Sequence, residues 1–154
     1  MLPDGHQGEV TVLGIDPGKH SGLAWFTGGK LLALEEVEPA ELAIVLVSKR
    51  PTVVIFEDSR LAKRTWTGEG STAKRTAMAR NVGEIDAWCK LIEATCKKLG
   101  IPAYGMAPSA KAGGAHGAKL DAAAFNRFSG WVGRSNQHQR DAAMIAWQFR
   151  RAAK

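Results

Sequence analysis

Apolar segments of strand length, each bounded by glycine or proline, make up the first part of this chain. The first ends in a Pro17-Gly18 pair and the second in a Gly28-Gly29 pair, before a third segment reaches residue 37. A Gly-Gly pair between two such runs is typical of a hairpin turn. The pattern therefore predicts three consecutive antiparallel strands over residues 9–16, 20–27 and 30–37.

The pattern changes after Pro39. Residues 40–49 would be apolar over much of the circumference of a helix. Residues 53–56 are four consecutive apolar residues, and Glu57 follows them. A strand that is apolar on both faces is typical of a central parallel strand, with the preceding helix as its crossover. Residues 101–106 give a third candidate parallel strand. We predict an α/β fold whose five-stranded mixed sheet is antiparallel over strands 1–3 and parallel over strands 1, 4 and 5, flanked by helices.

The remaining segments are a basic stretch, two glycine-containing loops and three helices. Residues 60–80 are rich in lysine and arginine and contain Trp66 and a tract of small residues. They are expected to form a mobile loop, whose end could run into the first turn of the next helix. We predict helices over residues 81–98, 120–128 and 136–151. The first of them carries Ile85, Trp88 and Ile92 on its apolar face.

Length and composition predict one soluble domain. The 154 residues are 45% hydrophobic and 23% charged, and no apolar run is long enough for a membrane span. We expect a single domain over residues 1–154, with residues 1–8 as a flexible tail. Cys89 and Cys96 lie about 10 Å apart along a predicted helix, too far for a disulfide, so we expect reduced core thiols and a cytoplasmic protein.

The net charge of +6 changes the picture of function, since it favours an anionic partner. Nucleic acid is favoured over a membrane surface because no basic amphipathic helix is evident. A basic but inert surface is the simpler alternative.

Four residues form a candidate metal site. Asp16 and Glu57 each end a predicted parallel strand, and such strands share their carboxyl edge. His138 and Asp141 lie three residues apart at the start of the last helix, where side chains meet. Three carboxylates and one imidazole suit Mg²⁺ or Mn²⁺ better than zinc.

Each of these residues also has a simpler interpretation. Asp16 could cap the turn that follows it, and Glu57 could mark a strand that leaves the core. His138 and Asp141 could be ordinary residues of a helix start, where an acid is favoured by the helix dipole. The joint arrangement is what favours the metal site.

Three short motifs resemble a known family. The sequences GIDPG at residues 14–18, VVIFE at 53–57 and HQRDAA at 138–143 are similar to those of RuvC-type Holliday junction resolvases, in the RNase H-like (retroviral-integrase) superfamily. The resemblance follows the order of elements over residues 9–150 and is most specific in GIDPG. The turn from Asp16 to Gly22 is about one residue shorter than in bacterial RuvC. A phage-type member of the family and a bacterial one both stay open.

The resemblance implies an activity. It implies an endonuclease that resolves four-way DNA junctions with two Mg²⁺ ions, or Mn²⁺ as a substitute, leaving 5′-phosphate and 3′-hydroxyl ends. It places the family's metal ligands and catalytic residues on Asp16, Glu57, His138 and Asp141. It also implies a homodimer through helix 81–98, which fits a symmetrical cut of two strands.

Basic residues near the predicted crevice are candidates for DNA binding. Lysine and arginine neutralise phosphate charge, and a tryptophan can stack on an unpaired base or pack against its own loop. Within the later glycine-rich loop the resemblance supports Lys111 or Lys119 without choosing between them. The candidates are Arg60, Lys63, Arg64, Trp66, Lys74, Arg75, Lys111 and Lys119.

Two other functions stay open at this stage. A related RNase H-like nuclease could act on RNA, as the YqgF-type enzymes do, or on other branched DNA. The second alternative is a protein that binds branched nucleic acid without cleaving it. The complete set of four candidate metal ligands argues against this alternative. An ATP-binding loop is excluded, because residues 113–119 lack the required spacing.

Overall fold

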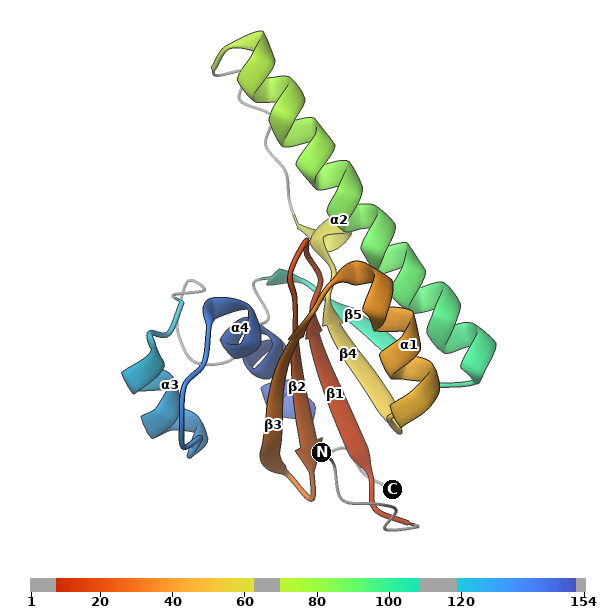
Figure 1. Ribbon diagram of the computed structural model, residues 1–154, viewed down its shortest axis with the longest axis vertical. Coiled ribbons are helices and arrows are strands. Elements are labelled where there is room, and N and C mark those ends of the chain that lie inside the picture. Colours follow the sequence, from red (N-terminus) through yellow and green to blue (C-terminus); the bar gives the residue numbers. More distant parts are fainter. Residues whose placement is uncertain (1–7, 63–69, 109–118, 152–154) are drawn as a thin grey trace.

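The protein folds around one five-stranded sheet (Figure 1). The computed structural model describes residues 8–62, 70–108 and 119–151, and the predicted tail lies outside them except for Gly8. The strand order is β3-β2-β1-β4-β5, with β1 antiparallel to β2, β2 antiparallel to β3, and β1, β4 and β5 parallel. The predicted fold class is confirmed.

The strands lie close to their predicted positions. They are β1 (Thr11–Asp16), β2 (Ser21–Thr27), β3 (Lys30–Val37), β4 (Val53–Glu57) and β5 (Ala103–Met106). In the turn between β1 and β2, the Ser21 hydroxyl accepts from the Gly18 amide and donates to the Gly18 carbonyl. Gly28 and Gly29 both have positive φ, as the tight turn into β3 requires.

Helices cover both faces of the sheet. On one face α1 (Pro39–Lys49) and α2 (Thr72–Leu99) pack together, and on the other lie α3 (Ala122–Ser129) and α4 (Gln137–Ala146) (Figure 1). Short 3₁₀ turns follow β4 and α4, as η1 (Ser59–Leu61) and η4 (Trp147–Phe149). The β4 strand is apolar on both faces because both are covered.

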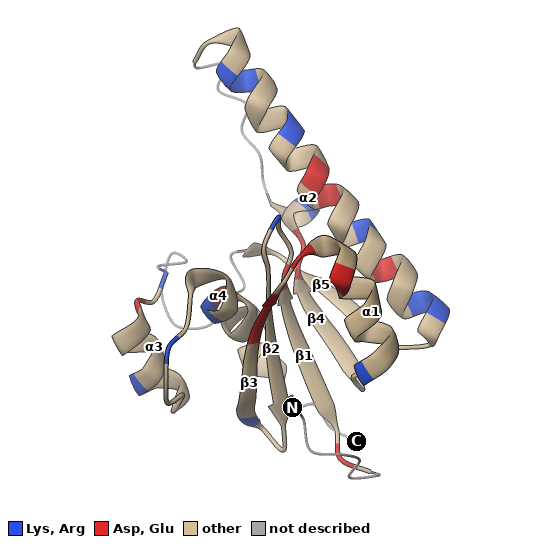
Figure 2. Ribbon diagram, viewed as in Figure 1, with Lys and Arg blue, Asp and Glu red and all other residues tan. Residues whose placement is uncertain are grey.

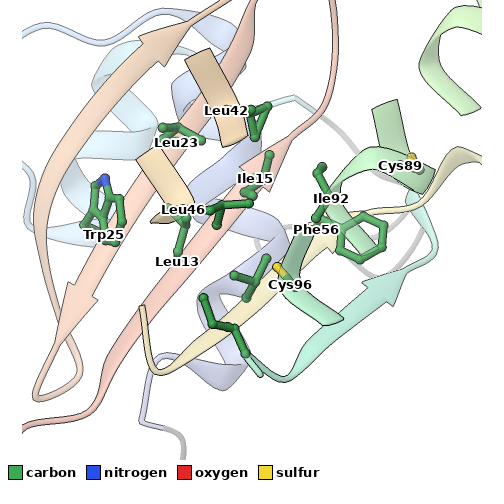
Figure 3. Packing of buried hydrophobic residues seen from close by; sticks show 12 residues of the cluster. Leu13, Ile15, Leu23, Trp25, Leu42, Leu46, Phe56, Cys89, Ile92 and Cys96 are labelled. Carbon is green, nitrogen blue, oxygen red and sulfur yellow. The ribbon is translucent and has the colours of Figure 1, made fainter. Parts of the chain in front are cut away.

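Alternation along the strands sends side chains into two separate cores. Odd residues of β1 and even residues of β4 face α1 and α2, and their neighbours face α4. Figure 3 shows the first core, where helix residues meet Leu13, Ile15 and Phe56 of the sheet. The helix residues labelled there are Leu42, Leu46, Cys89, Ile92 and Cys96.

Both cysteines are free and buried in this core, as predicted. Burial raises the pKa of the Cys89 thiol, and it raises that of Cys96 to about 11. Both thiols are therefore protonated at neutral pH, which makes them poor nucleophiles and metal ligands.

The start of α2 corrects the prediction of a loop over residues 60–80. The helix begins at Thr72, nine positions before the predicted start at residue 81, and is 28 residues long. Ser71 caps it by accepting a hydrogen bond from the Lys74 amide, and the alanine, lysine and arginine residues that follow are good helix formers. Residues 72–80, called the α2 arm below, are all exposed and extend past the sheet (Figure 1).

The end of the last helix is also different from the prediction. It was expected to reach residue 151, but α4 ends at Ala146 and tightens into η4. Trp147 packs edge-on against Phe26 of β2 at 6.0 Å between ring centroids, and Arg150 stacks on the same indole. Among the described residues, no helix is both long and apolar enough to cross a membrane.

Candidate functional site

Asp16 and Glu57 end neighbouring strands. Ile15 and Phe56 are partners in the parallel pairing of β1 and β4, so the next residue on each strand carries a carboxylate at the same edge. Parallel strands lie about 4.8 Å apart. Side chains alternate along each strand, so Asp16 lies on the same face as Val12, and Glu57 on the same face as Ile55. This is the face that α4 covers, and Oε2 of Glu57 is buried there. The predicted meeting of the two strand ends is therefore present.

Two glycines let α4 approach the sheet very closely. A Cβ on Gly22, the β2 partner of Asp16, would lie 2.0 Å from the carbonyl oxygen of His138. A Cβ on Gly14 would lie 2.2 Å from the carbonyl oxygen of Ala142, one turn further on. Any side chain at these positions would push the helix away. Because both residues are glycine, the first turn of α4 can lie directly over the end of β1 and the start of β2.

The start of α4 is fixed by its cap and by β3. Asn136 accepts from the Gln139 amide and the Gln139 side chain accepts from the Asn136 amide, each at 2.9 Å, which is a reciprocal capping box. The amide group of Asn136 also donates to Glu36 of β3. Glu36 lies opposite Gly22 in the sheet, so the cap is attached beside the glycine that the helix covers.

His138 reaches Asp16 from this helix start. Its Nδ1 lies 3.3 Å from Oδ2 of Asp16, although the two residues are 122 positions apart in sequence. The imidazole is about half exposed, whereas the Asp16 carboxylate is only 15% exposed. His20 lies beside it, with ring centroids 6.4 Å apart, and forms a 3.7 Å contact with Glu36.

Asp141 lies one turn further along α4 and is buried. Its Oδ1 accepts from the Gln137 side-chain amide at 2.9 Å, and its Oδ2 lies 4.0 Å from the Lys119 ammonium. A cation and an amide donor thus already face this carboxylate, as burial of a charge requires. A metal ion would compete with both groups for the same oxygens.

The donor set fits a hard divalent cation, but its members are not arranged as a finished cage. Over residues 8–62, 70–108 and 119–151, no three His, Cys, Asp or Glu side chains are grouped closely enough to hold a metal ion. Carboxylates on two strand ends and one helix can close on an ion by rotamer changes. The donor atoms therefore suit Mg²⁺. Asp16 and Glu57 are the two carboxylates that the pairing of β1 with β4 brings side by side.

Comparison with solved structures matches the fold over most of the chain. RuvC of T. thermophilus in complex with a Holliday junction substrate aligns with a TM-score of 0.61 and 26% identity, covering 90% of this chain and 91% of that one. A second Thermus thermophilus RuvC structure gives 0.57 and 24%, covering 90% and 92%. The fold is that of RuvC. The RuvC-type resemblance and the RNase H-like architecture are confirmed.

The RuvC-like match rests on structure rather than on sequence profiles. No family model matches the sequence, and no curated protein matches it. At such distance the fold persists because buried positions constrain packing, while surface loops change freely.

The candidates for DNA binding fall into four groups on this RuvC-like frame, and the fourth is Arg60 alone. Lys74 and Arg75 are exposed in the first turn of the α2 arm, where Figure 2 shows basic residues at the free end of the helix. Lys119 is exposed beside Asp141. The remaining candidates Lys63, Arg64, Trp66 and Lys111 lie outside the described residues.

Arg60 has a different environment from the other basic candidates. Its guanidinium is bound by Asp58 and by Glu93 of α2, and its side chain is 26% exposed. A contact with DNA phosphate stays a prediction for this residue, but its principal partners are within the chain.

Sequence reasoning missed Asp58, Glu36 and the cap residue Asn136. The D-S-R spacing after Glu57 carried a signal, because an aspartate often accepts from the amide two residues later, as Asp58 does from Arg60. The cap was also readable, since Asn136 precedes Gln139 at capping-box spacing. The contact between Asn136 and Glu36 spans 100 positions and had no local signal.

Proposed function

We propose that this protein is a metal-dependent endonuclease that resolves four-way DNA junctions. The observation that carries the proposal is the convergence of β1, β4 and α4, which sets His138 against Asp16 beside the end of β4 within a RuvC-like fold. One matching structure is described as a complex with a Holliday junction substrate. The net charge of +6 supports an anionic substrate.

The site residues have separable roles in this proposal. Asp16, Glu57, Asp141 and His138 would hold two Mg²⁺ ions, which supply activation of a water molecule and neutralisation of charge at the leaving oxygen. Asp16 occupies the central position, because it lies on the middle strand of the sheet and contacts α4.

His138 is placed to handle a proton. It is about half exposed, and it contacts Asp16 through Nδ1, an arrangement that orients the ring. A ring oriented in this way can accept a proton from the attacking water, and the products are a 5′-phosphate and a 3′-hydroxyl. Lys119 would hold a phosphate oxygen next to Asp141.

A second copy of the chain completes the proposal, since two strands of a junction are cut symmetrically. Ile92 and Ile85 of α2 are used by the chain's own core, which excludes Ile92 as a contact between subunits. Beside this buried stripe the same helix carries Trp88, which is partly buried, and Leu91, which is 40% exposed. We therefore place the dimer contact at Trp88 and Leu91.

A substrate panel tests the proposal. The protein is incubated with a four-way DNA junction, a duplex of the same sequence and an RNA duplex, each in Mg²⁺ and in Mn²⁺. Paired symmetrical nicks in the junction alone are the expected result. Preferential cleavage of RNA would indicate a YqgF-like activity, and tight junction binding without cleavage in either metal would indicate a binding protein. Either result contradicts the proposal.

A further inference from the structure

The segment that follows Glu57 is attached to α2 at three successive turns. The Cys89 thiol lies 3.7 Å from the Glu57 carbonyl oxygen, and the Ser59 hydroxyl donates to Asp86 at 3.0 Å. Arg60 makes the third attachment, to Glu93. Positions 86, 89 and 93 lie on one side of a helix, so the end of β4 and η1 run along a single face of α2.

Arg60 makes the most extensive of these attachments. Its Nε and Nη2 donate to the two carboxylate oxygens of Asp58 at 2.7 and 2.6 Å. Its Nη1 and Nη2 donate to the two oxygens of Glu93 at 3.1 and 2.6 Å. Four of its five N–H groups are thereby used in two fork-shaped pairs, a geometry that lysine cannot reproduce.

The fold makes room for this arrangement. Asp58 is buried, with 4% of its surface exposed, and a Cβ on the neighbouring Gly105 would lie 2.7 Å from its Oδ2. Hydrogen bonding from Arg60 lowers the pKa of Asp58 against the opposing effect of burial. The hydrogen bonds to Asp58 and then Glu93 raise the pKa of Arg60. A buried carboxylate of this kind depends on its partner.

We propose that Arg60 is a positioning residue for strand cleavage, which through Asp58 and Glu93 fixes the Glu57 carboxylate relative to α2 and its arm. This inference rests on the proposed nuclease function, in which Glu57 is a metal ligand. It differs from the role predicted from sequence, in which Arg60 contacts DNA phosphate directly.

The position of Asp58 explains how the effect is transmitted. Adjacent residues of a strand point to opposite faces, so Asp58 is held on the α2 face while Glu57 points toward α4. A shift of the backbone at Asp58 moves the Glu57 carboxylate by a similar distance. A displacement of about 1 Å at a reacting centre is enough to lower a rate about a hundredfold.

The test compares Arg60→Ala, Arg60→Lys and Glu93→Ala with wild type. Arg127→Ala is the matched control, since it removes an exposed arginine from α3, away from the site. Single-turnover cleavage is measured at saturating four-way junction over a range of Mg²⁺ concentrations. Junction affinity is measured without divalent metal over a range of NaCl concentrations.

The expected result separates rate from affinity. Arg60→Ala and Glu93→Ala both lower the saturated rate at least tenfold and raise the Mg²⁺ concentration needed for half-maximal rate. The salt dependence of junction affinity stays as in wild type, Arg60→Lys does not restore the rate, and Arg127→Ala behaves as wild type. Because Glu93 is exposed, its variant keeps the fold even where Arg60→Ala lowers stability.

Two outcomes would overturn the inference. If Arg60→Ala reduces the salt slope by nearly one while Glu93→Ala tightens binding, Arg60 contacts phosphate. If both variants cleave at the wild-type rate, Arg60 does not position Glu57.

Failure of the proposed nuclease function is a separate result, seen as absence of cleavage by wild type. Amide hydrogen exchange then still tests the attachment. Arg60→Ala is expected to increase exchange in β4 and in the middle of α2 while leaving β1 and β2 protected, and unchanged exchange there contradicts it.

Discussion

The two helices that reach the candidate site are held in different ways. The first two turns of α4 lie directly against the backbone of Gly22 and Gly14, so the distance of the helix from the sheet is set by direct contact. The α2 helix packs Ile92 and Cys96 into the first core, and near the site it is also held by hydrogen bonds through Asp86 and Cys89 and by an ion pair through Glu93. The residues of its arm are all exposed. Close backbone packing thus positions the α4 residues of the candidate site, whereas polar contacts are added to core packing where α2 passes that site.

This contrast separates catalysis from substrate contact. A close-packed helix cannot move without losing van der Waals contact, which suits residues that must keep a fixed geometry. A helix held by polar groups at one side leaves its free end available to an anionic partner. Variants on the two sides are therefore expected to alter different measured quantities.

Asp16→Asn is expected to have the largest effect. It removes the charge of the carboxylate at the end of β1 that contacts His138 of α4, so the rate of junction cleavage should fall at least a thousandfold. Binding should be kept or tightened, because one negative charge is lost near the phosphate backbone. Gel-shift and cleavage assays on the same preparation measure both, and cleavage at the wild-type rate contradicts the metal-site assignment.

Gly22→Ala tests the close-packed side. The added methyl would meet the His138 carbonyl at 2.0 Å, so the free energy of unfolding should fall by about 3 kcal/mol and cleavage should fall with it. Gly83→Ala is the matched control in α2, where a Cβ meets nothing within 4 Å. That variant should gain about 0.5–1 kcal/mol, because alanine is the better helix former. Chemical denaturation measures both, and equal effects would contradict the contrast.

The Asp58–Arg60 pair on the polar side predicts a pH dependence. The pKa of Asp58 in the folded protein is below its ordinary value of 3.8, so the pair stabilises the fold at pH above 3.8 and loses that contribution as pH falls through the lower, folded value. Asp58→Asn should therefore be less stable than wild type by about 2 kcal/mol at pH 7, with the difference shrinking below pH 3.8. A difference that is constant down to pH 2 contradicts the pairing.

The smallest expected effect is on the α2 arm. The double variant Lys74→Ala, Arg75→Ala should weaken junction binding several-fold and reduce the salt slope by nearly two, because each phosphate contact contributes about 0.9. The saturated cleavage rate should stay unchanged. Lys97→Ala with Lys98→Ala, in the last turn of the same helix, is the control. An equal loss of affinity in both double variants would show that only net charge matters.

The sequence predicted the sheet well, because its strands carry long apolar runs that end in glycine, proline or acid. Asp16 and Glu57 were placed side by side by parallel pairing, and His138 by the apolar stripe of the last helix. Their roles as metal ligands stay predictions, since no metal-holding group is found within the described ranges.

The parts that were not predicted depend on long-range contacts. The basic stretch was predicted as a loop that could run into the first turn of the next helix, but the helix start was placed at residue 81, although Ser71 caps it. The contact between Arg60 and Glu93 spans 33 positions, and strand periodicity carries no information about such pairs. Gly22 was assigned to a strand correctly. Its close contact with α4 could not be predicted, because it depends on His138, which is far away in the sequence.

Because α2 is long, a small change of its angle at the attachment to the segment after β4 moves its free end by a larger distance. From Asp86 to the first residue of the arm is fourteen residues, or about 21 Å at 1.5 Å per residue. A tilt of about 5° at the attachment would carry the free end about 2 Å sideways. The angular stiffness of the attachment at Asp86, Cys89 and Glu93, together with the core packing of the same helix, thus sets how accurately Lys74 and Arg75 meet a phosphate. Lengthening or shortening the helix would change that accuracy without altering the site.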